Sequence, residues 1–311
     1  MKFSIVIPVY NRPDQIKELL QSIIDQTFRD LEIIIVEDGS VISSEEIVNN
    51  YSKIINLKYL KTKNQGPGIA RNNGSKLAQG EWLIFLDSDC TIPVNYFHEI
   101  NLFLDKNKNI DFFGGPDRSD RSYSFLQKSI NYSMTSLLTT GGIRGSKFSV
   151  DKFLPRSFNM GVKKEFFNKV NGFASLRFGE DLDLSYRLIS IGANSGLILN
   201  AFVYHKRRTS LSSFYKQIYS SGSARVLLNK NHPGTFKIFH LFPIIFILVS
   251  VLSLYFYFLQ IPLLLYLMLI FLNSSYTNKD PISGLLSVLT TCVQFFAYGI
   301  GFLKSFFKTY L

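Results

Sequence analysis

The sequence predicts an α/β fold, with a mostly parallel sheet in its N-terminal part and a C-terminal α-helical transmembrane segment. Strand-like and helix-like patterns alternate four times in the first ninety residues, which is typical of a parallel sheet with right-handed crossovers. Residues 83–86 form an apolar run that suits a strand buried on both faces. After residue 237, apolar runs reach the length that spans a bilayer.

The first ninety residues contain the alternating strand and helix patterns. Residues 2–10 are rich in β-branched side chains and end in the turn Asn11-Arg12-Pro13-Asp14. Apolar residues at helical spacing predict helices at 14–26 and 69–78, and Ser43 or Ser44 can cap a third helix that ends near residue 53. Further strands are expected at residues 31–36, 57–60 and 81–86.

The segment from residue 94 to His205 is expected to complete this domain. Predicted helices span residues 94–105, 124–138, 164–170 and 178–191. Predicted strands lead into the Gly-Pro turn at 114–116 and span 158–162 and 195–204, the last ending at His205. Residues 139–145 predict a loop of a kind that is uncommon unless it is a lid, a binding loop or disordered.

Charge is unevenly distributed along the chain. Lys and Arg number 34 against 23 Asp and Glu, a net charge of +11, and no acidic residue occurs from Leu184 to Lys279. A basic stretch at residues 205–237 precedes the apolar runs, which indicates the anionic cytoplasmic face of a membrane. Since no nucleic-acid-binding motif is present, nucleic acid is not expected as a partner.

The C-terminal third is expected to contain two parts after an α/β domain at residues 1–210. Residues 211–235 predict an amphipathic helix, either in the membrane interface or packed on the domain as a surface helix. Residues 236–311 predict two to three transmembrane helices, from apolar runs at 238–259, 263–272 and 282–303. Gln260-Ile261-Pro262 predicts a hairpin whose second arm is short.

The number of membrane spans stays open at this point. Three spans would place Lys304 and Lys308 outside the cell, which the positive-inside tendency disfavours. Two spans, with one segment re-entrant or flat on the membrane, would avoid this.

Two further features indicate a cytoplasmic α/β domain. Cys90 and Cys292 occur in unlike regions, so no disulfide framework is implied, which fits a reducing compartment. The N-terminal apolar run is broken by Pro8 and is too short for a secretory signal peptide.

Asp87, Ser88 and Asp89 follow the buried strand at 83–86. Open α/β sheets bind ligands at the carboxyl ends of their strands. Two carboxylates at this spacing can converge on one divalent cation, and Mg²⁺ typically joins carboxylates to substrate phosphates. Taken alone, the same residues also suit a solvated turn.

A series of five motifs resembles glycosyltransferase family 2. In order, they are FSIVIPVYNR at 3–12, VEDGS at 36–40, GIARNNG at 68–74, DSD at 87–89 and ED at 180–181. Each is weak alone, but five in order at family-like spacing are specific, and they cover about residues 1–210. The resemblance implies a GT-A (Rossmann-like) fold and an inverting enzyme with a nucleotide-sugar donor. It also favours the metal site over the turn.

The resemblance implies roles for residues at the donor and metal site. The residues that resemble the donor-binding positions are Pro8, Tyr10, Asn11, Arg12, Asp38, Arg71, Asp87 and Ser88. Asp89 resembles the ligand of Mn²⁺ or Mg²⁺, with Asp87 near the metal and the ribose. His205 follows the strand whose end often supplies a further metal or diphosphate ligand in the family, although a lone His is more often structural.

The resemblance also implies a catalytic pair. Asp181 resembles the base that takes the proton of the acceptor hydroxyl, and Glu180 either orients Asp181 or is itself the base. Inverting transfer is one in-line displacement with an oxocarbenium-like transition state, so no covalent enzyme intermediate is needed. A bound metal would offset charge on the departing diphosphate.

The acceptor is expected to be a lipid-linked saccharide. Processive synthases of the family carry Gln-x-x-Arg-Trp, whereas here Gln217 is followed by Ile218, Tyr219 and Ser220. A single transfer to a polyprenyl-diphosphate glycan, in surface polysaccharide biosynthesis at the inner (plasma) membrane, suits a multi-pass membrane tail better. A UDP-sugar is the commonest donor of the family.

Two other functions fit parts of the sequence. A non-catalytic membrane scaffold could keep the fold, but it would not need every motif carboxylate. A nucleotidyltransferase would predict a Gly-rich basic loop after the first strand, where this chain has Tyr10-Asn11-Arg12-Pro13.

Overall fold

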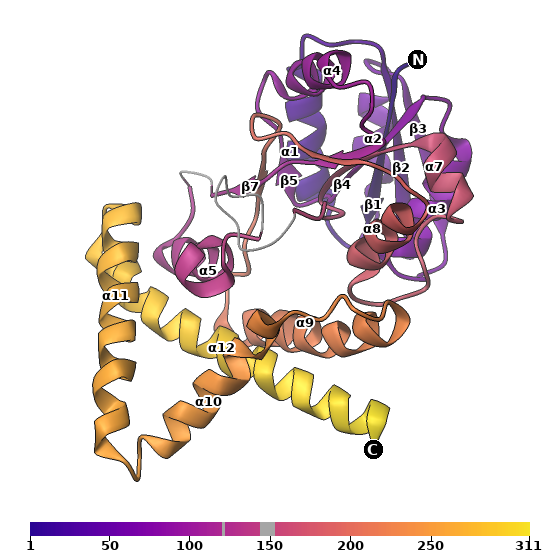
Figure 1. Cartoon of the computed structure of the whole chain (residues 1–311). Coiled ribbons are helices and arrows are strands. Elements are labelled where there is room, and N and C mark those ends of the chain that lie inside the picture. The colour runs from indigo at the N-terminus through magenta and orange to yellow at the C-terminus, as the bar shows by residue number, and fades with distance from the viewer. Residues whose placement is uncertain (120–121, 144–152) are drawn as a thin grey trace. The chain divides into compact units, whose positions relative to one another are not determined.

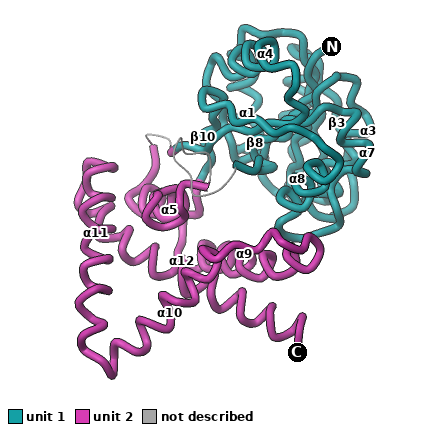
Figure 2. The backbone as a smooth tube through the Cα atoms, viewed as in Figure 1, with its two compact units in different colours: residues 1–118, 144–147, 152–206 teal, residues 119–143, 148–151, 207–311 magenta. Residues whose placement is uncertain are grey.

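The computed structural model describes residues 1–119, 122–143 and 153–311 of the 311-residue chain. The described residues form two compact units (Figure 2). Unit 1 contains residues 1–118 and 153–206, and unit 2 contains residues 119, 122–143 and 207–311. Residues 122–143 therefore group with the C-terminal helices, although they lie inside the range 1–210 expected for the α/β domain.

The described part of unit 1 contains a seven-stranded, mostly parallel sheet (Figure 1). The strand order is β3-β2-β1-β4-β8-β6-β9. Only β8 runs antiparallel to its neighbours β4 and β6. The strands are β1 (Phe3–Val9), β2 (Leu31–Asp38), β3 (Leu57–Thr62), β4 (Trp82–Leu86), β6 (Phe112–Gly114), β8 (Asn159–Lys163) and β9 (Ser195–Leu197). The predicted α/β fold is thereby confirmed.

Helices cover both faces of this sheet, because its central strands are apolar on both faces. In β1, Phe3, Ile5 and Ile7 face one buried cluster and Val6 faces the other. The first cluster is covered by α1 (Pro13–Ile24), α2 (Glu45–Tyr51) and α4 (Tyr96–Lys106), and the second by α3 (Pro67–Leu77), α7 (Lys164–Lys169) and α8 (Glu180–Ser190). Gly74 allows α3 to lie close to the sheet, since a Cβ there would meet Val6 Cγ1 at 2.6 Å.

A second, three-stranded sheet of unit 1 has the order β5-β10-β7. Its strands are β5 (Cys90–Thr91), β10 (Val203–His205) and β7 (Asp117–Arg118). The prediction of one strand at 195–204 is wrong, because the chain turns where Ala201 N–H donates to Ile198 O at 3.2 Å. The turn sends β9 to the large sheet and β10 to the small one, where His205 pairs with Cys90.

Unit 2 is helical. Its elements are α5 (Phe125–Thr135), α6 (Leu137–Thr140), α9 (Leu211–Asn231), the short η1 (Ile238–Leu241), α10 (Phe242–Leu252), the short η2 (Tyr257–Leu259), α11 (Gln260–Asn278) and α12 (Pro281–Tyr310). The predicted helix at 124–138 ends earlier, because Ser136 is extended and caps α6 through a bond from Leu138 N–H. The predicted loop at 139–145 begins only after Thr140, and its last two residues lie outside the described residues.

Two described helical segments, Tyr257–Asn278 and Pro281–Tyr310, are long and apolar enough to cross a membrane, and Ile238–Leu252 is a shorter apolar segment. The predicted position of the hairpin turn, at residues 260–262, is wrong, since the first arm ends at Leu252 and the second arm is the longer one. Pro262 does not break α11 because it is the third residue of that helix, where a backbone N–H has no helical partner.

Helix α12 is the central helix of unit 2, and α9 packs along it. A Cβ on Gly222 of α9 would meet Tyr298 O at 2.2 Å, and a Cβ on Gly301 of α12 would meet Tyr219 O at 2.2 Å. Ser223 Oγ donates to Gly301 O at 3.0 Å. The two backbones therefore approach closely, as small residues permit in helix pairs.

Helix α5 joins α12 through polar side chains that are fully buried. Ser133 Oγ lies 2.7 Å from Thr290 Oγ1, and Gln294 Nε2 donates to Ser133 O at 2.8 Å. Ser129 Oγ donates to Ser283 O at 2.9 Å. A helix expected in the α/β domain is thus hydrogen-bonded into the C-terminal bundle.

Candidate active site

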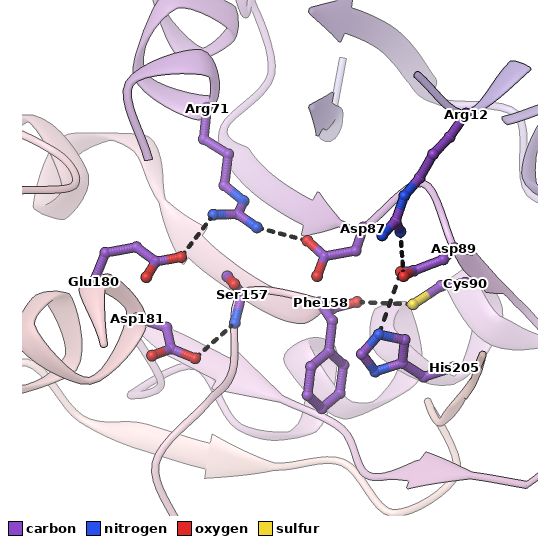
Figure 3. A network of polar contacts seen from close by, with 10 residues as sticks. All are labelled: Arg12, Arg71, Asp87, Asp89, Cys90, Ser157, Phe158, Glu180, Asp181 and His205. Carbon is purple, nitrogen blue, oxygen red and sulfur yellow. Dashed lines mark hydrogen bonds and ion pairs between the residues drawn. The ribbon is translucent and has the colours of Figure 1, made fainter. Parts of the chain in front are cut away.

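The predicted site residues gather at one edge of the large sheet. β1, β2 and β4 are parallel, so the loops that follow them lie at the same edge. Asp87 to Asp89 follow β4, Tyr10 to Arg12 follow β1, and Asp38 ends β2. The first turn of α8 brings Glu180 and Asp181 to the same network (Figure 3).

Arg71 connects the loop after β4 to the start of α8. Its Nη2 lies 2.6 Å from Asp87 Oδ1 and its Nη1 lies 3.1 Å from Glu180 Oε1. The side chain is only 3% exposed. Burial would lower the pKa of Arg71, but the charges of Asp87 and Glu180 raise it, so the guanidinium stays charged. One cation therefore links two carboxylates that are 93 residues apart in the chain (180 − 87).

Glu180 and Asp181 differ in environment although they are neighbours. Burial and the charge of Asp181 raise the pKa of Glu180 to about 7, against the opposing effect of Arg71. Asp181 Oδ1 accepts from Leu182 N–H at 2.8 Å, and Oδ2 accepts from Ser157 N–H at 3.5 Å. The positive end of the α8 dipole favours carboxylates at both positions.

Asp89 lies between Arg12 and His205. Asp89 Oδ2 is paired with Arg12 Nη1, and Oδ1 lies 3.2 Å from His205 Nε2. Burial would raise the pKa of Asp89, but His205 and Arg12 together lower it. The sequence separates Asp89 from His205 by more than a hundred residues, and the pairing of β5 with β10 brings them together.

Asp89, His205 and Cys90 could surround a cation, because their ligand atoms all lie within 4.8 Å of one another. A carboxylate and an imidazole suit Mn²⁺ well. Cys90 fits less well, since burial raises its pKa and keeps it a thiol, which also lies 3.9 Å from Phe158 O. Asp87, the other expected metal ligand, faces Arg71 instead.

Asp38 and Asn11 bind backbone in the loops around the expected donor site. Asp38 Oδ1 and Oδ2 accept from Gln65 N–H at 2.9 Å and Gly66 N–H at 2.8 Å. Asn11, in the left-handed region with φ 52°, accepts from Val41 N–H at 2.7 Å and Ile42 N–H at 3.0 Å. Both side chains therefore fix the loops after β1, β2 and β3 to one another.

For Pro8, Tyr10 and Ser88, the part of the chain that the structure describes offers no side-chain hydrogen bond or ion pair that would support a role in donor binding. Pro8 is half-buried within β1, Tyr10 is exposed just after it, and Ser88 is buried between the two aspartates. Sequence reasoning missed Arg156, whose Nη1 lies 4.0 Å from Asp181 Oδ1. No motif marks this arginine, because it lies in the irregular stretch before β8.

The profile of glycosyl transferase family 2 matches residues 4–170, more than half of the 311 residues. The chain belongs to glycosyl transferase family 2. The matched range contains Asp38, Arg71, Asp87 and Asp89 and ends before Glu180, so it agrees with the first four motifs of the resemblance.

Curated relatives of this family 2 chain include larger proteins. It is 28% identical over 221 residues to an uncharacterized glycosyltransferase of Haemophilus influenzae, covering 68% of this chain and 71% of that protein. It is 28% identical over 216 residues to the minor teichoic acid biosynthesis protein GgaB of Bacillus subtilis, covering 68% of this chain but only 23% of GgaB. The poly(ribitol-phosphate) beta-N-acetylglucosaminyltransferase TarS of Staphylococcus aureus is 38% identical over 111 residues, 34% of this chain and 19% of TarS.

Solved structures share the fold at low identity. Mannosyltransferase PcManGT from Pyrobaculum calidifontis, in complex with GDP-Man and Mn²⁺, aligns over 99% of this chain and 88% of its own with TM-score 0.65 and 14% identity. S. aureus TarS 1–349, in complex with UDP-GlcNAc, aligns over 73% of this chain and 67% of its own with TM-score 0.52 and 22% identity. The likeness concerns the fold, and the predicted GT-A fold of this family 2 chain is confirmed.

Proposed function

We propose that this chain is an inverting glycosyltransferase that moves one sugar from a nucleotide-diphosphate sugar to a hydroxyl of a lipid-linked saccharide. The network of Asp87, Arg71 and Glu180, with contacts of 2.6 and 3.1 Å, is the observation that carries the proposal. It joins the loop that also holds Asp89 to the helix start that holds Asp181. In this proposal, Asp89, which acts on the leaving diphosphate, and Asp181, which acts on the attacking hydroxyl, therefore belong to one polar network.

In this proposal Asp181 is the base that takes the proton of the acceptor hydroxyl as the hydroxyl attacks the anomeric carbon. Glu180 is held by Arg71 and orients the first turn of α8. Arg71 and Arg12 place positive charge near the departing diphosphate. Asp89 and His205 would hold Mn²⁺ or Mg²⁺, which supplies further positive charge to that diphosphate.

The donor is proposed to be a UDP-sugar, with a GDP-sugar as the second choice. TarS is a structural neighbour in complex with UDP-GlcNAc, and PcManGT is one in complex with GDP-Man. Pro8, Tyr10, Asn11, Arg12, Asp38, Arg71, Asp87 and Ser88 are proposed to surround the nucleotide, some by contact and some by holding loops in place.

The acceptor is proposed to be a polyprenyl-diphosphate glycan of surface polysaccharide assembly. GgaB is named for teichoic acid biosynthesis, and TarS for transfer to poly(ribitol-phosphate). The two span-length apolar helices and the basic stretch before them support a multi-pass anchor in the plasma membrane, with the catalytic unit in the cytoplasm.

Donor binding by the detergent-purified protein tests the proposal. UDP-, GDP-, dTDP- and CMP-sugars are compared by thermal shift, with Mn²⁺ and with EDTA. A Mn²⁺-dependent rise in melting temperature for one nucleotide is expected, since a ligand that binds only the folded state stabilises it. Equal melting temperatures with every nucleotide, in the presence of acceptor lipid as well, would favour a non-catalytic scaffold.

Substitutions of the two functional aspartates test the roles. Asp181→Asn is expected to lower the transfer rate at least about 100-fold, because general-base catalysis typically contributes that much, while donor binding stays. Asp89→Ala is expected to remove the Mn²⁺-dependent donor shift and the transfer together. Asp25→Asn, an exposed aspartate in unit 1, is the matched control. Normal turnover by Asp181→Asn would assign the base to Glu180 or to another group.

A further inference from the structure

Arg156 is a nearly buried cation beside the proposed base. Its Nη1 lies 4.0 Å from Asp181 Oδ1, and the two side chains are 18% and 17% exposed. At this distance the two groups form an ion pair without a hydrogen bond. Both residues belong to unit 1.

Asp181 does not need Arg156 to hold it in place. Its Oδ1 already accepts a 2.8 Å hydrogen bond from Leu182 N–H at the start of α8, and its Oδ2 faces Ser157 N–H. The carboxylate is therefore oriented by backbone on both sides. The guanidinium of Arg156 adds positive charge next to it and does not fix its direction.

The guanidinium of Arg156 lacks the partners that comparable arginines of unit 1 have. Among the described residues, its one charged partner is Asp181, at 4.0 Å, and its Nε–H is buried without a hydrogen bond, as is that of Arg71. Arg71 reaches Asp87 at 2.6 Å, and Arg187 reaches Asp183 at 2.7 Å. A guanidinium has five N–H donors in a planar fork, and leaving a buried donor unpaired is unfavourable. The terminal Nη1 and Nη2 donors of Arg156, and not its buried Nε, are therefore the groups that a ligand at Asp181 can reach.

We propose that Arg156 binds a phosphate group of the acceptor and thereby places the acceptor hydroxyl at Asp181. This inference rests on the proposed function, in which Asp181 receives the proton of that hydroxyl. Arg156 Nη1 lies 4.0 Å from Asp181 Oδ1, so an acceptor whose hydroxyl is bound at Asp181 has its neighbouring atoms close to the Arg156 guanidinium. The planar fork of arginine matches the oxygens of a phosphate, and Arg12 and Arg71 are already engaged by Asp89 and Asp87.

Two kinds of acceptor share this chemistry. In a polyprenyl-diphosphate saccharide, the diphosphate adjoins the sugar that offers the hydroxyl. In a polyol-phosphate chain, of the kind in the name of TarS, a phosphodiester adjoins the polyol hydroxyl. The inference concerns the phosphate beside the nucleophilic hydroxyl, and the acceptors used in the experiment separate the two sources.

The experiment measures transfer by the full-length protein to two matched acceptor pairs. One pair is a short-chain prenyl-diphosphate N-acetylglucosamine and its neutral octyl glycoside, and the other is a ribitol-phosphate oligomer and ribitol. Arg156→Ala is expected to raise KM about 10- to 100-fold for the phosphate-bearing member of one pair, the loss typical of a charged hydrogen bond. The sensitive pair identifies the source. KM for the donor, and the slow hydrolysis of the donor by water, are expected to stay unchanged.

Two further variants sharpen the result. Arg156→Lys keeps the charge without the fork and is expected to recover part of the lost acceptor affinity. Arg177→Ala, which removes an exposed arginine four residues before Asp181, controls for local charge and is expected to behave like wild type. If Arg156→Ala instead lowers kcat equally for neutral acceptors and for water, and shifts the pH profile, Arg156 acts on Asp181 and the phosphate assignment is wrong.

A binding measurement keeps this inference separate from the proposed function. The ³¹P NMR linewidths of ribitol 5-phosphate and of a prenyl-diphosphate N-acetylglucosamine are recorded with wild type, Arg156→Ala and Arg177→Ala. Broadening of one probe that only Arg156→Ala abolishes supports the site even if no donor is ever turned over. Equal broadening by all three proteins, or none by wild type, overturns it.

Discussion

At the scale of single residues, Glu180 is a buried carboxyl group whose ionisation opposes folding. Burial and Asp181 raise its pKa from 4.5 to about 7 in the folded protein. Between these values the folded state binds more protons than the unfolded state, so stability falls as pH rises from about 4.5 to about 7 and then levels off. The destabilisation is therefore fully present above the folded pKa and absent below the unfolded one.

We predict that Glu180→Gln reduces this fall, because the amide does not ionise. Thermal unfolding between pH 4.5 and 8, in EDTA and without donor, measures the effect. The melting temperature of wild type is expected to drop with rising pH relative to that of Glu180→Gln. A constant difference between the two proteins across this pH range would contradict the assignment of the raised pKa to Glu180.

Asn11 provides a second prediction at this scale, because it combines a left-handed backbone with two accepted hydrogen bonds. Asn11→Gly keeps the backbone conformation and loses the acceptor, whereas Asn11→Asp keeps both. We expect Asn11→Gly to raise KM for the donor roughly 3- to 10-fold, the loss of about one hydrogen bond, with kcat unchanged. Asn11→Asp is expected to stay within about twofold of wild type.

Hydrogen exchange at the backbone amides of Val41 and Ile42 measures whether their hydrogen bonds to Asn11 are present, and it does not require the protein to be enzymatically active. Faster exchange is expected in Asn11→Gly and not in Asn11→Asp. If both variants raise KM for the donor equally, the side-chain amide of Asn11 contacts the nucleotide directly, and its role is not to hold the loop at Val41 and Ile42 in place.

The residues of the site were predictable to different degrees. Asp87 and Asp89 could be placed at the sheet edge from the sequence, because a buried strand ends in front of them. The partner of Asp87 could not be predicted from the sequence. Arg71 lies on helix α3, and the rotation of that helix against the sheet depends on Gly74 and its neighbours. Arg156 had no signal in the sequence, because only the tertiary packing of the segment before β8 brings it to Asp181.

At the scale of elements, the contact between α9 and α12 depends on glycines that face the partner backbone. Replacing Gly by Ala in an ordinary helix stabilises it by about 1 kcal/mol. A Cβ on Gly222 would meet Tyr298 O at 2.2 Å, so the two helices must separate. Overpacking of this kind typically costs about 1–3 kcal/mol and so exceeds the gain in helix propensity.

We therefore predict that Gly222→Ala lowers the thermal stability of the detergent-purified protein. Ser221→Ala, an exposed position of the same helix, is the control and is expected to leave the melting temperature within about a degree, as surface substitutions usually do. A higher melting temperature for Gly222→Ala would show that helix propensity outweighs the close approach.

Predictions of elements succeeded where one local pattern dominated. β1, α1 and β4 were recognised because apolar spacing alone sets them. The division of 195–204 into β9 and β10 was missed, because a turn at Ile198 to Ala201 keeps both ends buried and leaves the apolar pattern unbroken. The expected apolar run at 263–272 stops short of the end of α11 at Asn278, because Asn273 and Ser274 are polar. These side chains pair with Tyr132 and Ser287.

At the scale of the whole molecule, the described residues of the two units are stabilised in different ways. Unit 1 buries apolar residues on both faces of a sheet. In unit 2, α11 leaves large apolar side chains outside, among them Leu265 at 61% and Met268 at 57% exposure. Surfaces of this kind are rare in water-soluble monomers and are expected where lipid is the surrounding medium.

We predict that Leu265→Lys combined with Met268→Lys releases the protein from membranes washed with alkaline carbonate. Each lysine near the centre of a spanning helix costs about 2.5–3.5 kcal/mol on insertion scales. Ile54→Lys, which replaces an apolar residue of unit 1 that is 69% exposed, is the control and is expected to stay in the membrane fraction. Equal retention of both proteins would indicate that α11 does not face lipid.

The grouping of α5 with α11 and α12 lay beyond the reach of sequence analysis. Residues 124–138 read as one more helix of the α/β domain, because their apolar spacing does not tell which partner they face. The packing of α5 against α12 depends on hydrogen bonds of hydroxyl and amide groups such as Ser133 and Gln294. Such residues are common in helices, and their positions in the sequence do not show which of them pair.

The bond between Ser133 and Thr290 also has a consequence for biosynthesis. The two residues are 157 positions apart in the chain. At about 5–20 residues per second, a ribosome needs roughly 10 to 30 s to add that many residues. During this interval the polar side chains of α5 lack their partners on α12. The ribosome adds β8, β9 and β10 of unit 1 in the first part of the same interval. The nascent chain therefore passes through a stage in which all described strands of unit 1 have been made and α5 still lacks its hydrogen-bond partners on α12.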